Sequence, residues 1–118
     1  ERAARIAGNA TAFGVPQLAL VEGTAPAALA GLPVPDAVFI GGGGSEAGVM
    51  DAAITALKRG GRLVANAVTL EMEALLLKEY GARGGTLTKI EIARAAPVGG
   101  MSGWRPAMPV TQWCWIKE

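Results

Sequence analysis

Apolar residues along this chain follow two patterns, and their alternation predicts an α/β protein. Between residues 2 and 13 they recur at helical spacing, and the helix-ending residues Gly14 and Pro16 follow. Residues 38–40 instead form a continuous apolar run, which is typical of a strand that is covered on both faces. In order, the predicted elements are helix 2–13, strand 17–22, a short helix capped by Thr24, strand 36–40, a helix from Ser45 to Gly60-Gly61, strand 62–68, a helix capped by Thr69 and reaching Tyr80, strand 88–92 and strand 110–116.

The last two predicted strands differ from the earlier ones. Thr88, Ile90 and Ile92 alternate with charged residues, so their strand has one wetter face. No helix separates it from residues 110–116, and two strands joined in this way pair antiparallel. The connection between them, residues 95–109, is rich in Gly and Pro and is predicted to be irregular. We therefore expect a mostly parallel, Rossmann-like sheet that ends in an antiparallel hairpin.

Four consecutive glycines, Gly41 to Gly44, directly follow the apolar strand 36–40. Glycines contribute no side-chain packing, and they let bare backbone approach a ligand or another segment closely. Open α/β sheets bind their ligands outside the carboxyl ends of the strands. The glycine run therefore predicts a binding site at this edge, either for a phosphate group or for another cofactor.

Composition restricts the class of protein further. The 118 residues are enough for about one domain, and 51% hydrophobic with 18% charged residues is typical of a globular chain. The net charge of +1 is scattered, and Lys58, Arg59 and Arg62 match the C-terminal end of a helix, so no nucleic acid is expected as a partner. Neither an apolar run of bilayer length nor a basic leader is seen, which predicts a cytoplasmic protein without membrane contact.

The reactive residue types are few. Cys114 is the single cysteine, so an internal disulfide and a cysteine-based metal cluster are not expected. Histidine is absent, which removes Ser/His/Asp and Cys/His catalysis and histidine-ligated zinc. We therefore expect no metal centre and no acid–base pair built on histidine.

Particular segments narrow the interpretation to one family. They are Glu22–Leu29, Ala37–Gly43, Gly60–Glu71 and Gly103–Trp113. The most specific part is the Trp-Arg-Pro sequence followed by Val-Thr-Gln-Trp. Taken together these segments, which extend over nearly the whole chain, resemble the decarboxylating precorrin methyltransferases of cobalamin biosynthesis, which are class I methyltransferases that use S-adenosylmethionine.

The resemblance implies a three-layer α/β sandwich in which residues 110–116 are the inserted antiparallel strand. The family's glycine-rich cofactor loop and first two strands would lie before Glu1, so residues 1–118 would be the C-terminal portion of one methyltransferase domain. We expect such a portion not to be stable alone, because its sheet would lack strands near the middle. The resemblance also implies a second methyltransferase domain ahead of this one and assembly into a homotetramer.

The reaction implied by the resemblance is methylation of a precorrin at two ring carbons, with loss of carbon dioxide from an acetate side chain. Because the sulfonium and the ring carbon react once they are held in line, few catalytic side chains are needed. Whether the substrate is the aerobic intermediate or the cobalt-containing anaerobic one stays open, and Trp-Arg-Pro favours the aerobic form by resemblance only.

The resemblance, together with position at the carboxyl edge of the sheet, predicts which residues form the site. Asn66, Thr69 and Glu71 stand at the end of strand 62–68, at the same edge as the glycine run. Glu71 is a weak candidate for moving a proton. The expected cofactor-binding residues are Gly23, Thr24, Ala25, Gly41 and Gly42, and the expected substrate-binding residues are Gly43, Gly44, Ser45, Asn66, Thr69, Trp104 and Arg105.

Most of these residues have a structural alternative. Thr24, Ser45 and Thr69 are suited to cap helices, and Glu71 suits a first helical turn by its charge alone. Trp104 can stack on a macrocycle, pack under its own loop or form a subunit interface. Trp113 and Trp115 are expected to be packing residues.

Two other functions remain open at this point. One is a nicotinamide- or nucleotide-binding Rossmann domain, and the other is a non-catalytic scaffold or oligomerisation fragment. Against the first stand the terminal hairpin and the absence of a Gly-x-Gly-x-x-Gly sequence between a strand and a helix.

Overall fold

The computed structural model describes residues 1–118, which form two compact units, Glu1–Leu32 and Pro33–Glu118. The first unit contains the helix α1 (Arg2–Ala12) and one 3₁₀ turn, η1 (Ala27–Leu29). Helix α1 confirms the helix predicted from the apolar spacing. It ends one residue before Phe13, whose amide still donates to the carbonyl of Asn9.

Two predictions for the first unit are wrong. Residues 17–22 form no strand, because no other segment supplies a ladder of hydrogen bonds, and Leu18 stays 56% exposed. The side chain of Thr24 does not cap the short helix, whose N-terminal flanking residue is Pro26. Instead the main-chain carbonyl of Thr24 accepts a hydrogen bond from the amide of Ala28.

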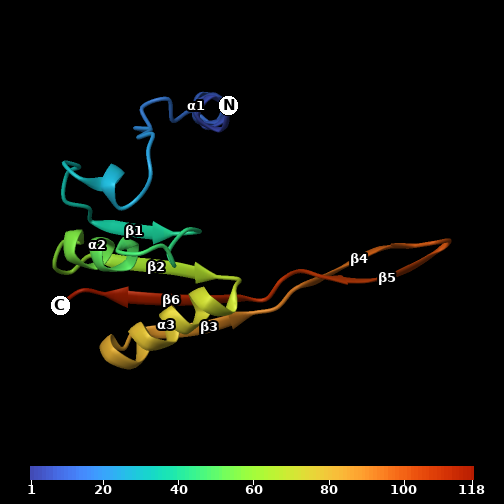
Figure 1. Cartoon of the computed structure of the whole chain (residues 1–118). Coiled ribbons are helices and arrows are strands. Elements are labelled where there is room, and N and C mark those ends of the chain that lie inside the picture. Colours follow the sequence, from blue (N-terminus) through green and yellow to red (C-terminus); the bar gives the residue numbers. More distant parts are fainter. The chain divides into compact units, whose positions relative to one another are not determined.

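The second unit contains a four-stranded sheet in the order β1-β2-β6-β3 (Figure 1). Strands β1 and β2 are parallel, and β6 lies antiparallel between β2 and β3. The prediction of a terminal antiparallel strand is therefore confirmed, and this strand is inserted between two others. The strands are β1 (Ala37–Ile40), β2 (Arg62–Ala67), β3 (Thr86–Ile90) and β6 (Val110–Ile116).

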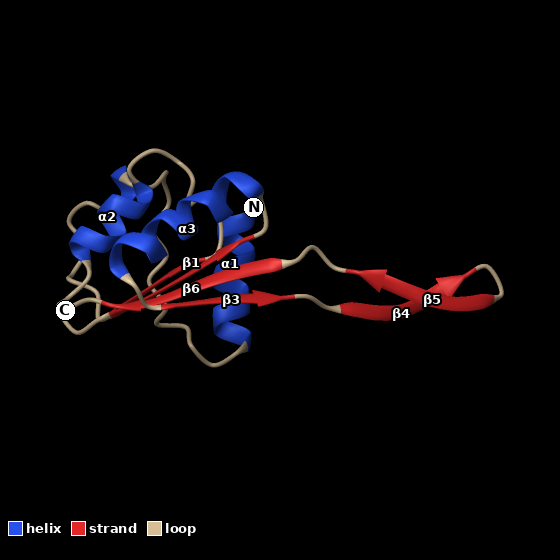
Figure 2. Cartoon of the chain, turned by 90° about the horizontal axis from the view of Figure 1, so that it is seen from below, coloured by secondary structure: helices blue, strands red, loops and turns tan.

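Two helices, α2 (Val49–Ala56) and α3 (Leu70–Arg83), cover one face of this sheet (Figure 2). On β2 every second residue is buried toward them, as the period of a strand requires. Removing these apolar side chains from water is the main force that holds the layers together. The core consists of Ile40, Met50, Ala53, Ile54, Leu57, Leu63, Ala65, Ala67, Met72, Leu76 and Trp113.

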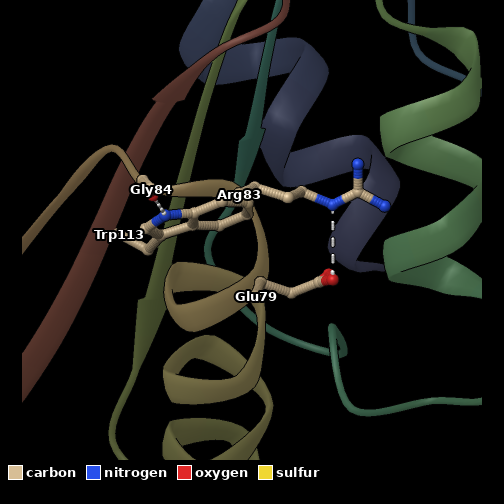
Figure 3. A network of polar contacts seen from close by, with 4 residues as sticks. All are labelled: Glu79, Arg83, Gly84 and Trp113. Atoms are coloured by element: carbon tan, nitrogen blue, oxygen red, sulfur yellow. Dashed lines mark hydrogen bonds and ion pairs between the residues drawn. The ribbon is translucent and has the colours of Figure 1, made fainter.

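Trp113 fixes the junction between β6 and the end of α3. Its side chain is fully buried, and its Nε1 donates a 2.8 Å hydrogen bond to the carbonyl of Gly84, the residue after α3 (Figure 3). The ring stacks on Trp115 with 5.6 Å between centroids. The expectation that both tryptophans are packing residues is confirmed.

The sheet face opposite the two helices is more exposed at β1 than we predicted. We expected strand 36–40 to be covered on both faces, yet Phe39 is 65% exposed. The reason is that β1 is an edge strand and both helices of this unit pack on the face of Val38 and Ile40.

Helix α2 starts later than the sequence predicted. Ser45 is not its N-cap, because residues 44–47 form turns and the flanking residue is Gly48. Gly48 has φ +81°, a conformation that other residues rarely adopt. Helix α3 continues through Gly81 to Arg83, beyond Tyr80, which the predicted helix reached.

Residues 95–109 are not irregular as predicted. Strands β4 (Ala93–Val98) and β5 (Met101–Pro106) form a two-stranded antiparallel ribbon, which we call the arm. Figures 1 and 2 show the arm projecting beyond the sheet. Pro97 does not prevent this, because each strand of a two-stranded ribbon has an outer edge where no amide is needed. No helix of the chain has both the length and the hydropathy to cross a bilayer.

Candidate functional site

The glycine run lies at the carboxyl end of β1, and its members differ in their surroundings. A Cβ on Gly44 would come within 2.8 Å of the Ile40 side chain and would also meet the flexible end of Met72, so a larger residue at this buried position would force the core to shift. A Cβ on Gly41 would come within 2.8 Å of the Phe39 ring. Gly42 and Gly43 face open space. Their exposed backbone is therefore the part of the run that is available to a ligand.

The carboxyl end of β2 lies beside this glycine turn, because β1 and β2 are parallel and Ile40 pairs with Ala65. Asn66 is half-buried, and its Oδ1 accepts a 2.9 Å hydrogen bond from Gln112 Nε2. The structure thus brings the glycine turn and Asn66 to the same edge of the sheet, as the sequence predicted.

Helix α3 begins shortly after β2 in the chain. Thr69 Oγ1 accepts a 3.2 Å hydrogen bond from the amide of Met72, which confirms the helix cap. Glu71 is exposed in the first turn, where its charge suits the helix dipole. The geometry gives Thr69 and Glu71 structural roles, and their contact with substrate stays a prediction.

The other predicted residues lie elsewhere. Trp104 and Arg105 are on β5 of the arm, and Trp104 is 77% exposed, so it does not pack under its own loop. The arm leaves the sheet at the edge where β1, β2 and β3 end (Figure 1). Gly23, Thr24 and Ala25 belong to the first unit, and their contact with a cofactor stays a prediction.

Sequence reasoning missed a charged cluster at this edge. Glu73 Oε2 accepts hydrogen bonds of 2.5 Å from both Lys89 Nζ and Thr111 Oγ1. The hydrogen bond from Lys89, followed by that from Thr111, lowers the pKa of the Glu73 carboxyl below its usual value. Lys89 is on β3 and Thr111 on β6, so Glu73 connects α3 to both strands that carry the arm. Glu73, Lys89 and Thr111 are distant in sequence, and the register of β3 and β6 brings them together.

A second missed group lies on the open sheet face. Gln112 is the cross-strand partner of Asn66, and its Oε1 is 3.7 Å from the Sγ of Cys114. Because the Gln112 amide donates to the Asn66 oxygen, the Asn66 amide group is left free to donate to another molecule. The antiparallel pairing of strand 110–116 with strand 62–68 places Gln112 opposite Asn66. A sequence analysis that included this pairing would have predicted their contact.

One hollow lies away from this edge. It has a volume of about 770 Å³ and lies at the opposite end of the strands, where Arg62 and Thr86 begin β2 and β3. Nearby, Arg83 Nε is 3.5 Å from Glu79 Oε1 (Figure 3), and its guanidinium lies over the Trp115 ring. We assign the Arg83–Glu79 ion pair and the contact of Arg83 with Trp115 a structural role. Glu79 also lines a smaller hollow together with Gly44 and Ser45.

Comparison with known proteins identifies the family. The family model described as "Precorrin methyltransferase domain" matches residues 1–117. A Sinorhizobium protein named precorrin-6Y C(5,15)-methyltransferase [decarboxylating] is 73% identical over 117 residues, 99% of this chain and 28% of that protein. A Mycobacterium tuberculosis protein of the same name is 45% identical over 110 residues, 93% of this chain and 28% of that protein.

A solved structure agrees with these relatives. The C-terminal domain of precorrin-6Y C5,15-methyltransferase from Rhodobacter capsulatus superimposes with a TM-score of 0.90 at 49% identity. The match covers 98% of this chain and 63% of that domain. The predicted Rossmann-like methyltransferase fold is confirmed, and the chain spans 28% of the length of the two curated relatives above.

Proposed function

This chain belongs to the precorrin methyltransferase family, and on that premise we propose that it is part of an enzyme that methylates a precorrin at ring carbons 5 and 15. The enzyme uses S-adenosylmethionine and removes carbon dioxide from an acetate side chain of the substrate, as a step of cobalamin biosynthesis in the cytoplasm. The observation that supports this function best is the open backbone of Gly42 and Gly43 beside Asn66, in a chain 73% identical to a relative of that name.

The glycine turn suits the cofactor. Gly41 and Gly42 would lie against its methionine end, where a side chain on Gly42 would fill the space now open. Gly23, Thr24 and Ala25 would border the adenine through backbone groups. S-adenosylmethionine supplies an electrophilic methyl group when bound. The residues of this chain would hold it in line with the acceptor carbon and keep water out.

The substrate would bind on the outer side of the same edge. The Gly43 backbone and the free amide of Asn66 offer hydrogen-bond donors to the carboxylates of a tetrapyrrole rim. Ser45 lies in the turn that follows, and Trp104 and Arg105 are on the arm beside this edge. Catalysis would depend on position more than on a proton donor, since Glu71 is exposed and histidine is absent. The electrons released by decarboxylation would pass into the conjugated macrocycle.

The arm suits assembly of several copies. Two-stranded ribbons are marginally stable in water, and this one exposes Trp104. Trp104 shares its ribbon face with uncharged residues, which fits a contact with a second copy of the chain. We propose a homo-oligomer, a tetramer by family resemblance. In the full-length protein, a further methyltransferase domain would precede this one.

The direct test is turnover by the full-length protein. Purified enzyme is incubated with its precorrin and S-adenosylmethionine that carries a labelled methyl group, and the product is analysed by mass spectrometry. We expect two labelled methyl groups and the loss of one carbon dioxide per substrate. Incubation without S-adenosylmethionine is the control. A product without label would contradict the proposed function.

A further inference from the structure

Two arginines face each other near the base of the arm. Arg94 on β4 is the cross-strand partner of Arg105 on β5, so both side chains leave the ribbon on the same face. Both residues are exposed. The four ion pairs of the structure involve other residues, so neither guanidinium has a carboxylate partner within the chain.

This arrangement is unfavourable unless an anion is present. Like charges directly opposite each other destabilise an antiparallel pair, because the Cβ atoms are about 5 Å apart. The arm has two strands and no covering layer, so little within it offsets the repulsion. A bound carboxylate would remove the repulsion, and two adjacent guanidinium groups can each bind a carboxylate by two hydrogen bonds.

The arginine pair lies close to the candidate site along the chain. Arg94 and Arg105 are the second cross-strand pair from the base of the arm. A 2.8 Å hydrogen bond from the Ala107 amide to the Ile92 carbonyl helps to close this base. Arg94 is four residues beyond Ile90, the last residue of β3, so at most about 14 Å of chain separates them. The arm emerges from the edge where β1 and β2 end (Figure 1). The glycine turn and Asn66 lie at the ends of these two strands.

The two faces of the arm differ in chemistry. Ala95, Pro97, Ser102 and Trp104 carry no charge and alternate with the residues of the arginine face. A symmetric contact through the arginine face would bring more positive charges together, so that face does not suit a second copy of the same chain.

We propose that Arg94 and Arg105 form a clamp for carboxylates on the rim of the tetrapyrrole substrate. This proposal rests on the proposed function and adds a substrate contact outside the sheet edge. The clamp orients the macrocycle through its side chains, at the periphery and away from the carbon that receives the methyl group. The arm thus has one face for substrate and one for assembly.

The test uses the full-length protein and a metal-free porphyrin with eight carboxylates as probe. Its affinity is measured by fluorescence titration for wild type, R94Q, R105Q and the double variant. R59Q is the matched control, because Arg59 is an exposed arginine remote from the arm. We expect the double variant to bind at least about tenfold more weakly, with a smaller salt dependence, and R59Q to bind like wild type. An affinity within twofold of wild type, or no binding by wild type, would overturn the clamp.

Two further measurements separate the alternatives. The oligomeric mass and the affinity for S-adenosylmethionine are expected to be unchanged in the double variant. A fall in oligomeric mass that accounts for the weaker binding would instead assign the arginines to a subunit contact and overturn the proposal. If wild type transfers methyl groups to its precorrin and the double variant has an unchanged KM, the clamp alone fails. If wild type transfers none, the proposed function fails.

Discussion

The ammonium group of Lys117 donates a 2.8 Å hydrogen bond to the carbonyl of Leu57, the residue that follows α2. The same group also donates to the carbonyls of Ile54 and Thr55. Helix α2 lacks a C-terminal glycine turn, since Leu57 is extended with φ −60° and ψ 134°. Lys117 therefore supplies, from the other end of the chain, the positive charge and the donors that the helix end requires.

We predict that Lys117→Met destabilises the protein by about 1–2 kcal/mol, because three carbonyls lose a charged donor in a partly buried position. Thermal unfolding of the full-length protein measures this. Lys58→Met is the control, since Lys58 belongs to an exposed ion pair with Asp36, and its effect should stay below about 0.5 kcal/mol. Equal effects of both substitutions would show that the cap contributes nothing.

Much of the fold follows from local sequence. Strand 36–40, strand 62–68 and the helix capped by Thr69 were predictable because each has an apolar pattern and a chemical boundary signal within a few residues. The approach of the glycine turn to Asn66 was predictable as well, since parallel strands place their carboxyl ends at one edge.

The remaining features depend on partners that are distant in sequence. Residues 17–22 have the composition of a strand, yet a strand requires hydrogen bonds from a neighbour. The arm was hidden because Pro97 and the paired glycines at its tip suggest a loop. The contact of Glu73 with Lys89 and Thr111 depends on the strand register, which local pattern does not contain.

Gly42→Val should weaken binding of S-adenosylmethionine by more than about tenfold, because the side chain would occupy the space above the glycine turn. Calorimetric titration of the full-length protein is the measurement. Gly100→Val is a matched control, because Gly100 also faces open space and has no positive φ, but lies in the turn of the arm. Wild-type affinity of the Gly42 variant would remove this turn from the cofactor site.

Trp104→Ser should lower the oligomeric mass of the full-length protein while its circular dichroism is retained. The indole is 77% exposed on the uncharged face of the arm, where a second subunit would bury it. Met101→Ser is the control, since Met101 is 81% exposed on the arginine face. Sedimentation velocity measures the mass, and an unchanged mass for Trp104→Ser would exclude this face as the contact.

Glu73 should make stability depend on pH in the acidic range. The pKa of the Glu73 carboxyl in the folded state lies below the usual value of 4.5. Its contribution to the free energy of unfolding is therefore fully present above that pH, and it is lost as the pH falls through the folded-state pKa. We predict that Glu73→Gln lowers the urea midpoint at pH 7 and that the difference from wild type shrinks toward pH 3. Glu71→Gln is the control, because Glu71 is exposed in the same helical turn. A difference independent of pH would contradict the ionic contact.

Gln112 should act on the substrate through Asn66. Its amide donates to Asn66 Oδ1 and so directs the Asn66 amide group outward as a donor. In Gln112→Glu the donor is replaced by an acceptor, the Asn66 amide turns toward it, and the oxygen then faces the carboxylates of the precorrin. We expect KM for the precorrin to rise about tenfold while the affinity for S-adenosylmethionine is unchanged.

The control for this substitution is Thr88→Val, since Thr88 is the other cross-strand neighbour of Gln112. A double-mutant cycle decides whether Gln112 acts through Asn66. If it does, Gln112→Glu has little further effect on KM once Asn66 is replaced by Ala, because the group that it orients is gone. Additive effects of the two substitutions would mean that Gln112 meets the substrate by another route.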